Sequence, residues 1–355
     1  MTTTATPGKS VDAALTDRSR DLVIYHFYER DAVYIRNFAH FLLFAYSTDC
    51  DFVIVVAGSH TIDLPQRPNV RYIFSENKNN DYGGYCAAMT ELGSDISNYD
   101  TVFFVNASVR GPFLPPFAMQ GWRRVFARKL TGNIGLVGST INILSERSPH
   151  SSQYKAKYGG CVPFSHVQTM AYALSKDALH FLRESGFYTE REALSKDEVI
   201  LDYEIRLSQL LLKNGWNITA LLPEYDSIDY RKPHAEINRV SVGGDPNWAS
   251  SYFGRAAHPF EVLFIKSSRG IFSAAHFDRL AYSALCRERP NVEWRNGKII
   301  ADYKAMLESI PSLSDVVPVS GEEYSMEHIL RMTAAMLEQI PLTRGIVGNM
   351  LNRLG

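Results

Sequence analysis

The chain has 355 residues, of which 45% are hydrophobic and 12% aromatic, and its formal net charge is -1. This composition excludes a disordered chain, and without a long Lys/Arg block nucleic acid is not expected as a partner. The four cysteines stand singly, so neither a zinc site nor a disulfide framework is expected, and buried, reduced thiols of a cytoplasmic protein are the simpler interpretation.

Residues 1–20 are rich in Thr and Ser and lack the apolar core of a signal peptide, which predicts a flexible segment. From residue 21 onward, short runs that are apolar at every position alternate with longer helical patterns. Such runs are typical of strands covered on both faces, so we expect a doubly wound, mostly parallel α/β sheet. The expected strands are 21–28, 51–58, 70–77, 101–108 and 134–144, and the expected helices are 32–46, 83–93 and 116–130.

The second half of the sequence predicts fewer strands and more helix than the first half. Beyond residue 226 the chain is rich in Gly, Pro and charge, which predicts a long loop of the kind that forms lids or binding loops. The last hundred residues look helical, and 326–340 has an amphipathic period. The other expected elements are a loop at 158–164, strands at 166–175 and 217–223, and helices at 176–185 and 196–214.

No apolar stretch is long enough to cross a membrane. The densest one, 38–47, is half of the roughly 20 residues that a span requires. We therefore expect a soluble protein, for which peripheral contact with a membrane stays open.

Polar residues after each expected strand are the first functional candidates, because ligands bind at the carboxyl ends of such sheets. One such run is 76-ENKNNDYGGYCAAM-89, where six polar residues lead into two glycines and a helix. Paired glycines let a ligand approach the backbone, and the first turn of a helix attracts phosphate. The alternative is an ordinary turn with a helix cap.

In the run 101-TVFFVNASVRGPF-113 a buried strand ends in two polar residues, Asn106 and Ser108, which we call the polar cluster. Nucleotide-sugar transferases often carry an Asp-x-Asp pair for a divalent metal at such a strand end, but this chain has Asn106-x-Ser108. Neutral Asn and Ser are poor ligands for Mg²⁺ or Mn²⁺, so no metal cofactor is firmly predicted, and either ion stays open as an alternative. If a diphosphate binds here, Arg110 is the nearest charge for it. Alternatively, Asn106 and Ser108 only close the turn before Gly111.

Glu204 lies at the border of an apolar helical stripe in 198-EVILDYEIRLSQLLLKNGW-216. A carboxylate at the edge of a buried face can have the raised pKa of a general base. An ordinary solvated glutamate is the alternative.

Together these parts resemble a GT-A-type glycosyltransferase, and most closely the rhamnan-synthesis F-like proteins of polysaccharide assembly. The resemblance covers about residues 21–270 and rests on NNDYGGY, YDTVFFVNASVRGPF, HVQTM, the helix that ends at Gly215, and 258-HPFEVLFIKSSRG-270. In inverting enzymes of this type an acidic pair precedes such a helix, and its second acid is the base. The pair would be Asp202 and Glu204.

The resemblance implies transfer of a hexose, with rhamnose or another deoxyhexose favoured, from a nucleoside diphosphate to a hydroxyl of a glycan or lipid-linked glycan. The expected location is the cytoplasm, with the inner face of the membrane left open as a place of attachment. The chain is therefore divided into a flexible N-terminal segment at 1–20, a transferase domain at 21–270 and a helical extension at 271–355. Without a metal pair, we expect the diphosphate charge to be stabilised by Arg110, Lys266 and Arg269 together with the helix start near Gly83 and Gly84. Two other classes stay open, namely a non-catalytic sugar-binding module and a nucleotide-sugar-modifying enzyme.

Several of these residues also have structural interpretations. Lys266 and Arg269 could be ordinary surface charges, and His166 an internally bonded histidine. The full set of donor-binding candidates is Tyr28, Glu29, Asn79, Asn80, Asp81, Gly83, Gly84, Asn106, Ser108, Arg110, His166, Gln168, Lys266 and Arg269.

Overall fold

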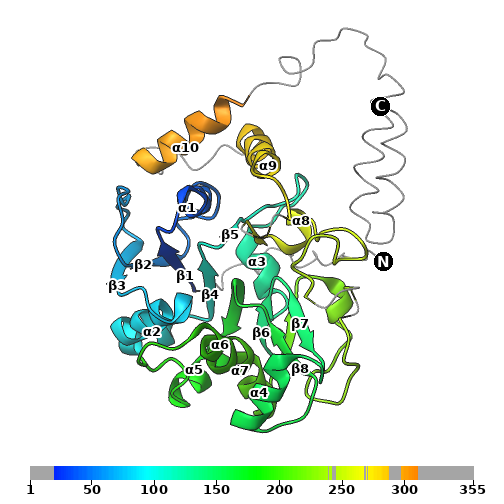
Figure 1. Ribbon diagram of the computed structural model, residues 1–355. Helices are drawn as coiled ribbons and strands as arrows, with labels where there is room; N and C mark the ends of the chain where they lie inside the picture. The colour runs from blue at the N-terminus through cyan, green and yellow to red at the C-terminus, as the bar shows by residue number, and fades with distance from the viewer. Residues whose placement is uncertain are drawn as a thin grey trace, which may run out of the picture. The chain divides into compact units, whose positions relative to one another are not determined.

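A computed structural model describes residues 20–238, 240–241, 245–267, 269, 271–287 and 297–310. Its centre is a seven-stranded sheet of order β10-β6-β9-β4-β1-β2-β3, of which Figure 1 labels β1 to β4 and β6. The strands are β1 (Asp21–Tyr28), β2 (Asp51–Ala57), β3 (Val70–Ser75), β4 (Thr101–Asn106), β6 (Ile134–Gly138), β9 (Ala171–Ser175) and β10 (Asn217–Ala220).

The sheet is parallel except at β9, which runs antiparallel to both β4 and β6. Strand β1 pairs in parallel with β2 and with β4, and His26 lies opposite Asn106. The predicted mostly parallel α/β class is therefore confirmed. Because β9 is reversed, the residues that precede it lie at the same edge as the carboxyl ends of the other strands.

Helices cover both faces of the sheet, as the fully apolar strands require. On one face, Tyr25 of β1 stacks on Phe41 of α1 at 4.1 Å between ring centroids. On the other face, Phe104 of β4 meets Tyr85 of α2 at 5.1 Å. The helices of this core are α1 (Ala32–Phe44), α2 (Asn80–Leu92), α3 (Trp122–Ala127), α4 (Pro149–Tyr158), α5 (Lys176–Glu184), α6 (Lys196–Val199) and α7 (Arg206–Lys213), with a π-helical turn η3 (Ile200–Ile205) between α6 and α7.

Two short antiparallel pairs lie beside the main sheet. Strand β5 (Val109–Arg110) pairs with β11 (Ile265–Lys266), and β7 (Ile141–Leu144) pairs with β8 (Phe164–Val167). The first pair brings Lys266 next to the polar cluster that follows β4, although the two segments lie about 160 residues apart in sequence.

Several predicted boundaries need correction. The expected strand at 134–144 divides into β6 and β7, and the one at 166–175 divides into β8 and β9, since each changes sheets at a polar turn. The helix expected at 116–130 is reduced to α3, because prolines occupy the segment before it. Helix α2 begins at Asn80 rather than at Gly83, and α4 was not predicted.

Helices α9 (Ala274–Arg287) and α10 (Lys298–Glu308) pack against this core. Phe277 of α9 stacks on Phe113 at 6.1 Å, and Nδ1 of the buried His40 lies 3.1 Å from the Tyr303 hydroxyl of α10. Within the described ranges, no helix is both long and apolar enough to cross a membrane. Both the N-terminal segment up to residue 19 and the amphipathic helix predicted at 326–340 lie outside the described residues.

All four cysteines are free, and Cys50 and Cys86 are buried. Cys161 and Cys286 are exposed, which corrects the expectation of four buried thiols.

Candidate active site

The polar cluster after β4 forms a hydrogen-bonded chain at the carboxyl edge of the sheet. The Asn106 amide nitrogen donates to Asp81 Oδ2 at 3.0 Å, and Asn106 Oδ1 accepts from the backbone nitrogen and the hydroxyl of Ser108 at 3.1 and 2.5 Å. Lys266 Nζ donates to the same Ser108 hydroxyl at 3.1 Å. Asn106 and Ser108 thus close a local turn, as the alternative interpretation expected, and also join an acid to an amine.

Glu204 lies in η3, and burial raises the pKa of its carboxyl to about 7, with a further increase from the charge of Asp81. The charges of Lys266 and Arg269 oppose that increase, so all four groups lie within electrostatic range of one another. No described residue donates a hydrogen bond to this carboxylate. A partly buried carboxyl that titrates near neutral pH can take a proton from a substrate.

Asp81 and Lys266 are perturbed by the same environment. Burial raises the pKa of Asp81, which the hydrogen bond from Asn106 opposes. Burial also lowers the pKa of Lys266, and the Glu204 charge opposes this shift. Desolvated groups of both signs therefore meet at one edge of the sheet, where their interactions are stronger than in water.

Arg269 brings a second cation to this edge. Its Nη1 donates to Asp245 Oδ2 at 2.6 Å, and Gln168 Nε2 donates to Asp245 Oδ1 at 2.8 Å. The Asn247 amide then donates to Gln168 Oε1 at 2.5 Å and to Thr140 Oγ1 at 3.0 Å. We call Asp81, Glu204, Asp245, Lys266 and Arg269 the charged cluster.

The sequence did not single out Asp245, Asn247 or Thr140. Thr140 follows β6 at the carboxyl edge, so the strand-end rule could have found it. Asp245 and Asn247 lie in the long segment predicted to be a binding loop, and the turn-forming run GGDPNW was the available signal.

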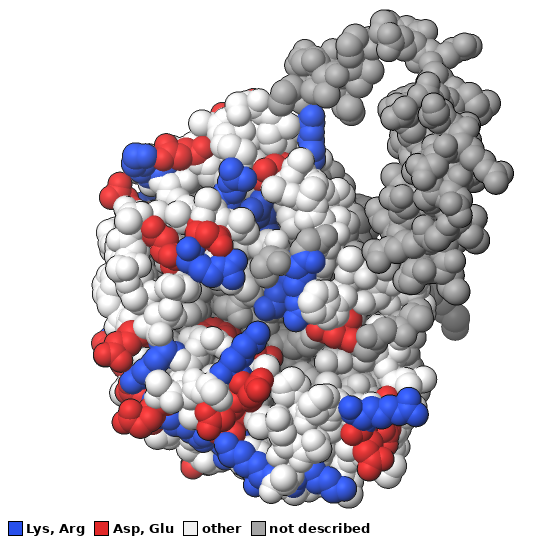
Figure 2. Space-filling model, viewed as in Figure 1, with Lys and Arg blue, Asp and Glu red and all other residues white. Residues whose placement is uncertain are grey.

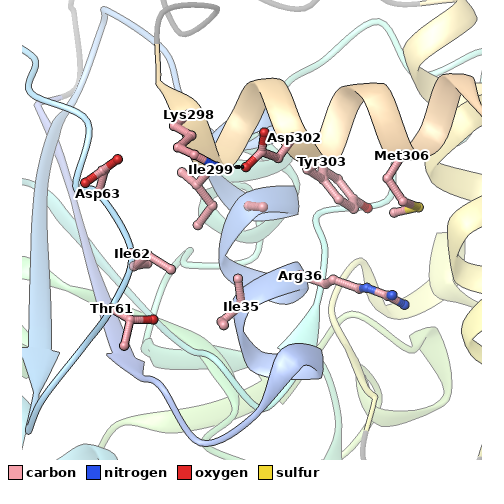
Figure 3. A pocket seen from close by; sticks show the side chains of 11 residues that line it. Ile35, Arg36, Thr61, Ile62, Asp63, Lys298, Ile299, Asp302, Tyr303 and Met306 are labelled. Atoms are coloured by element: carbon pink, nitrogen blue, oxygen red, sulfur yellow. Dashed lines mark hydrogen bonds and ion pairs between the residues drawn. The ribbon is translucent and has the colours of Figure 1, made fainter.

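Figure 2 shows one face of the molecule, on which basic and acidic side chains are interspersed without a broad area of one sign. A cavity of 350 Å³ lies elsewhere, between α1, residues 61–63 and α10, and Figure 3 shows its lining. No residue of the charged cluster lines this cavity. Two charged residues that do line the cavity, Lys298 and Asp302, pair with each other. We therefore locate the candidate site by its ionisable groups.

The expectation for Arg110 needs correction. Its side chain is 1% exposed, and its Nη1 donates to Asp278 Oδ1 of α9 at 2.7 Å. Its Nε donates to Asn37 Oδ1 at 3.0 Å. Because these partners already neutralise and cover the guanidinium, Arg110 is not available to a diphosphate.

Asn37 connects Arg110 to the backbone of the candidate site. Its fully buried amide nitrogen donates to the Ala107 carbonyl at 2.8 Å and to Ser267 Oγ at 2.7 Å. Ala107 lies between Asn106 and Ser108, and Ser267 follows Lys266. We call Asn37, Arg110 and Asp278 the paired network. Through Asn37 it holds in place the backbone at Ala107, inside the polar cluster, and the segment at Ser267, which follows Lys266.

Asp202 also lies apart from Glu204. It is 3% exposed and is bound by Lys157 at 2.7 Å, Arg191 at 3.1 Å and the Tyr158 hydroxyl at 2.8 Å. Residues two apart on a helical turn point to different sides. The expected acidic pair is therefore separated, and Asp202 is saturated with structural partners.

The polar run before α2 serves mainly to hold the chain. Asn79 is 6% exposed; its amide nitrogen donates to the carbonyls of Arg191 and Glu192, and its Oδ1 accepts from Leu194 N at 2.8 Å. Asn80 is exposed, and both asparagines have a positive φ, which Asn tolerates better than most residues.

The two glycines of α2 need a different explanation from the one expected. A Cβ at Gly83 would lie 2.1 Å from the Lys78 carbonyl oxygen, and one at Gly84 would lie 2.3 Å from His26 Cδ2. Both positions are buried. The glycines therefore permit close packing inside the protein and do not face a ligand.

The remaining candidates are close to the edge but have protein partners. Glu29 accepts from the backbone nitrogen and hydroxyl of Thr61 at 2.7 and 2.6 Å, while Tyr28 ends β1 partly buried. His166 is 5% exposed, lies 3.3 Å from the Phe164 carbonyl and has its pKa lowered by burial to about 4. His166 is thus a neutral internal residue.

The polar cluster does not fit a divalent metal site. Both polar atoms of the Asn106 amide are engaged within the protein, and the Ser108 hydroxyl is bonded to Lys266. Among the described residues no group of three or more His, Cys, Asp or Glu side chains could hold a metal ion.

No protein-family model and no curated protein matches the chain. Among solved structures, a mannosyltransferase from Pyrobaculum calidifontis in complex with GDP-Man and Mn²⁺ is 13% identical, with a TM-score of 0.34 over 94% of this chain and 84% of that chain. The galactosyltransferase LgtC is 11% identical, with a TM-score of 0.34 over 74% of this chain and 95% of that chain. The bifunctional glycosyltransferase WbbM is 12% identical, with a TM-score of 0.38 over 81% of this chain and 51% of that chain. At these scores the likeness carries no conclusion about this chain.

Proposed function

We propose that the chain is an inverting GT-A-type glycosyltransferase that uses a nucleoside diphosphate sugar as donor. The observation that carries the proposal is Glu204 at the carboxyl edge of the sheet, where burial raises its pKa to about 7 and where it lies within electrostatic range of Lys266 and Arg269. A base beside two cations suits a reaction in which a hydroxyl loses a proton while a diphosphate leaves.

In the proposed reaction the acceptor hydroxyl attacks the anomeric carbon of the donor, and the bond from that carbon to the diphosphate oxygen breaks. Glu204 takes the hydroxyl proton. Lys266 and Arg269 stabilise the charge on the departing diphosphate, a task that is commonly the largest electrostatic contribution at such a site. Asp81 keeps the pKa of Glu204 high through its own charge.

The finer parts of the proposal rest on the sequence resemblance. They are a hexose donor such as rhamnose or another deoxyhexose, an acceptor that is a glycan or lipid-linked glycan, and a place in the cytoplasm with peripheral membrane contact. A few pocket contacts decide between such sugars, so the donor has to be identified by binding.

A thermal-shift screen against UDP-, GDP- and dTDP-sugars, with and without EDTA, tests the proposal. A donor at 100 times its Kd should raise Tm by about 5 °C or more, and EDTA should leave that rise intact. The same donor should be consumed by the wild type and only bound by Glu204→Gln. Binding without turnover in the wild type would indicate a non-catalytic module, and strong activation by Mn²⁺ would contradict the roles of Lys266 and Arg269.

A further inference from the structure

Trp248 is a large exposed aromatic residue beside the charged cluster. Its side chain is 51% exposed, and the guanidinium of Arg269 lies 4.5 Å from the centroid of its ring. Other exposed aromatic residues of the described ranges, such as Phe74 and Phe253, pack against His60 and Tyr252 instead. Trp248 therefore combines exposure with direct contact to a residue of the candidate site.

The turn that carries Trp248 is anchored to the sheet. Asn247 is 3% exposed, and its amide donates to Thr140 and Gln168, which follow β6 and β8. Asp245 accepts from the Asn247 backbone nitrogen at 2.8 Å and from Arg269 at 2.6 Å. A ligand that contacts the indole would meet a ring already held in place, which lowers the entropic cost of binding.

Trp248 is connected to the proposed base through Arg269. Arg269 and Asp245 both shift the pKa of Glu204 through their charges, and Arg269 contacts the indole while Asp245 belongs to the turn that carries it. An acceptor whose hydroxyl reaches Glu204 must rest the remainder of its ring on a neighbouring surface. A pyranose has apolar C–H faces and a polar rim, so it suits a flat aromatic face bordered by groups that form hydrogen bonds.

We infer that the indole of Trp248 is the platform on which the acceptor sugar stacks, with a pyranose ring as the ligand class. This inference rests on the proposed glycosyl transfer and adds the location of its acceptor. Arg269 links the two parts of the site, because its guanidinium contacts the indole and its charge acts on Glu204.

The first test needs no donor. Tryptophan fluorescence is titrated with methyl α-L-rhamnopyranoside, methyl α-D-mannopyranoside, methyl β-D-galactopyranoside and methyl β-D-glucopyranoside. At least one should give a saturable change in the wild type and in Phe253→Ala, a variant of an aromatic residue that is 59% exposed on the same segment. The change should be lost in Trp248→Ala. A wild type that responds to none of the four, or an unaltered response in Trp248→Ala, would overturn the inference.

The second test uses the donor found by thermal shift and the glycoside that binds. In Trp248→Ala the acceptor KM should rise and the ratio of transfer to donor hydrolysis should fall by about tenfold or more, with partial recovery in Trp248→Phe. If the donor KM rises while the acceptor KM stays the same, Trp248 only supports Arg269, and the inference is wrong. The glycoside titration and the donor screen fail independently, so failure of the platform is distinguishable from failure of the proposed function.

Discussion

Two groups of charge, one buried and one partly buried, lie side by side in this fold and differ in how completely they are paired. In the paired network, Arg110 is 1% exposed, its Nη1 donates to Asp278 and its Nε donates to Asn37. In the charged cluster, Glu204 accepts no hydrogen bond from a described residue, and its pKa is raised to about 7. Arg110 and Ser108 are two residues apart, so the same strand end serves both groups.

The difference separates structural from chemical use of a charge. A buried ion with complete partners cannot change its protonation or accept a ligand without loss of stability. A partly buried ion with incomplete partners can change its protonation and can also bind a ligand. Asn37 joins the two groups, since it binds Arg110 on one side and the backbone of Ala107 on the other.

The largest expected effect is on turnover in Glu204→Gln. Loss of a general base should lower the transfer rate by about a hundredfold to ten-thousandfold, while donor binding remains. In the wild type, kcat/KM should rise with pH through about 7 as Glu204 loses its proton. The control is Glu184→Gln at the end of α5, which should be fully active. Full activity in Glu204→Gln would remove the proposed base.

The same variant also tests the pKa through stability. A carboxyl whose pKa is raised on folding contributes stability below its unfolded pKa, and this contribution is lost as pH rises through about 7. Glu204→Gln should therefore raise Tm relative to the wild type more at pH 8 than at pH 5. An equal difference at both pH values would contradict the raised pKa.

Asp278→Ala should have the largest effect on stability. It leaves Arg110 buried without its carboxylate, a change that costs about 3–5 kcal/mol, or about 10 °C in Tm. Asp302→Ala removes an exposed ion pair and should change Tm little, because solvent screens such a pair. The double variant Arg110→Met/Asp278→Leu should be more stable than Asp278→Ala, because no unpaired charge remains. Similar losses in Asp278→Ala and Asp302→Ala would show that the network is not tightly paired.

Lys266→Met should reduce turnover by about a hundredfold through loss of one charge on the departing diphosphate. It should have little effect on Tm, because burial lowers the pKa of Lys266 and so already disfavours its charged form. Lys266→Arg keeps the charge and should recover part of the rate in the same donor-consumption assay. A Tm loss as large as that of Asp278→Ala would assign Lys266 to structure instead.

Asp81→Asn should have the smallest effect, a shift of the pH profile. Without the Asp81 charge, the pKa of Glu204 should fall, and the acid limb of kcat/KM should move down by about one pH unit or less. Asp95→Asn, in the 3-10 turn η2 (Gly93–Asn98) before β4, is the matched control and should leave the profile in place. An unchanged profile in Asp81→Asn would show that the two acids are not coupled.

Local patterns predicted part of this site because they depend on local chemistry. Apolar runs fixed the positions of β1, β2, β3 and β4, and the polar residues that follow such strands gather at one edge of a parallel sheet. The position of Glu204 at the border of an apolar stripe predicted partial burial, which agrees with its raised pKa.

Pairing across long sequence separations could not be predicted in this way. Arg110 looked like a free cation because its carboxylate, Asp278, lies 168 residues later. The glycines looked like a ligand loop because neither the Lys78 carbonyl nor the His26 ring is visible in a local pattern.

The sequence by itself determined the class of fold, the reactive edge of the sheet and the residue types gathered there, because side-chain periodicity and strand ends are local properties. Only the tertiary structure decided which charges are paired and which remain available. Burial and electrostatic coupling depend on segments brought together from distant parts of the chain, as Lys266 is brought to Ser108 and Trp248 to Arg269.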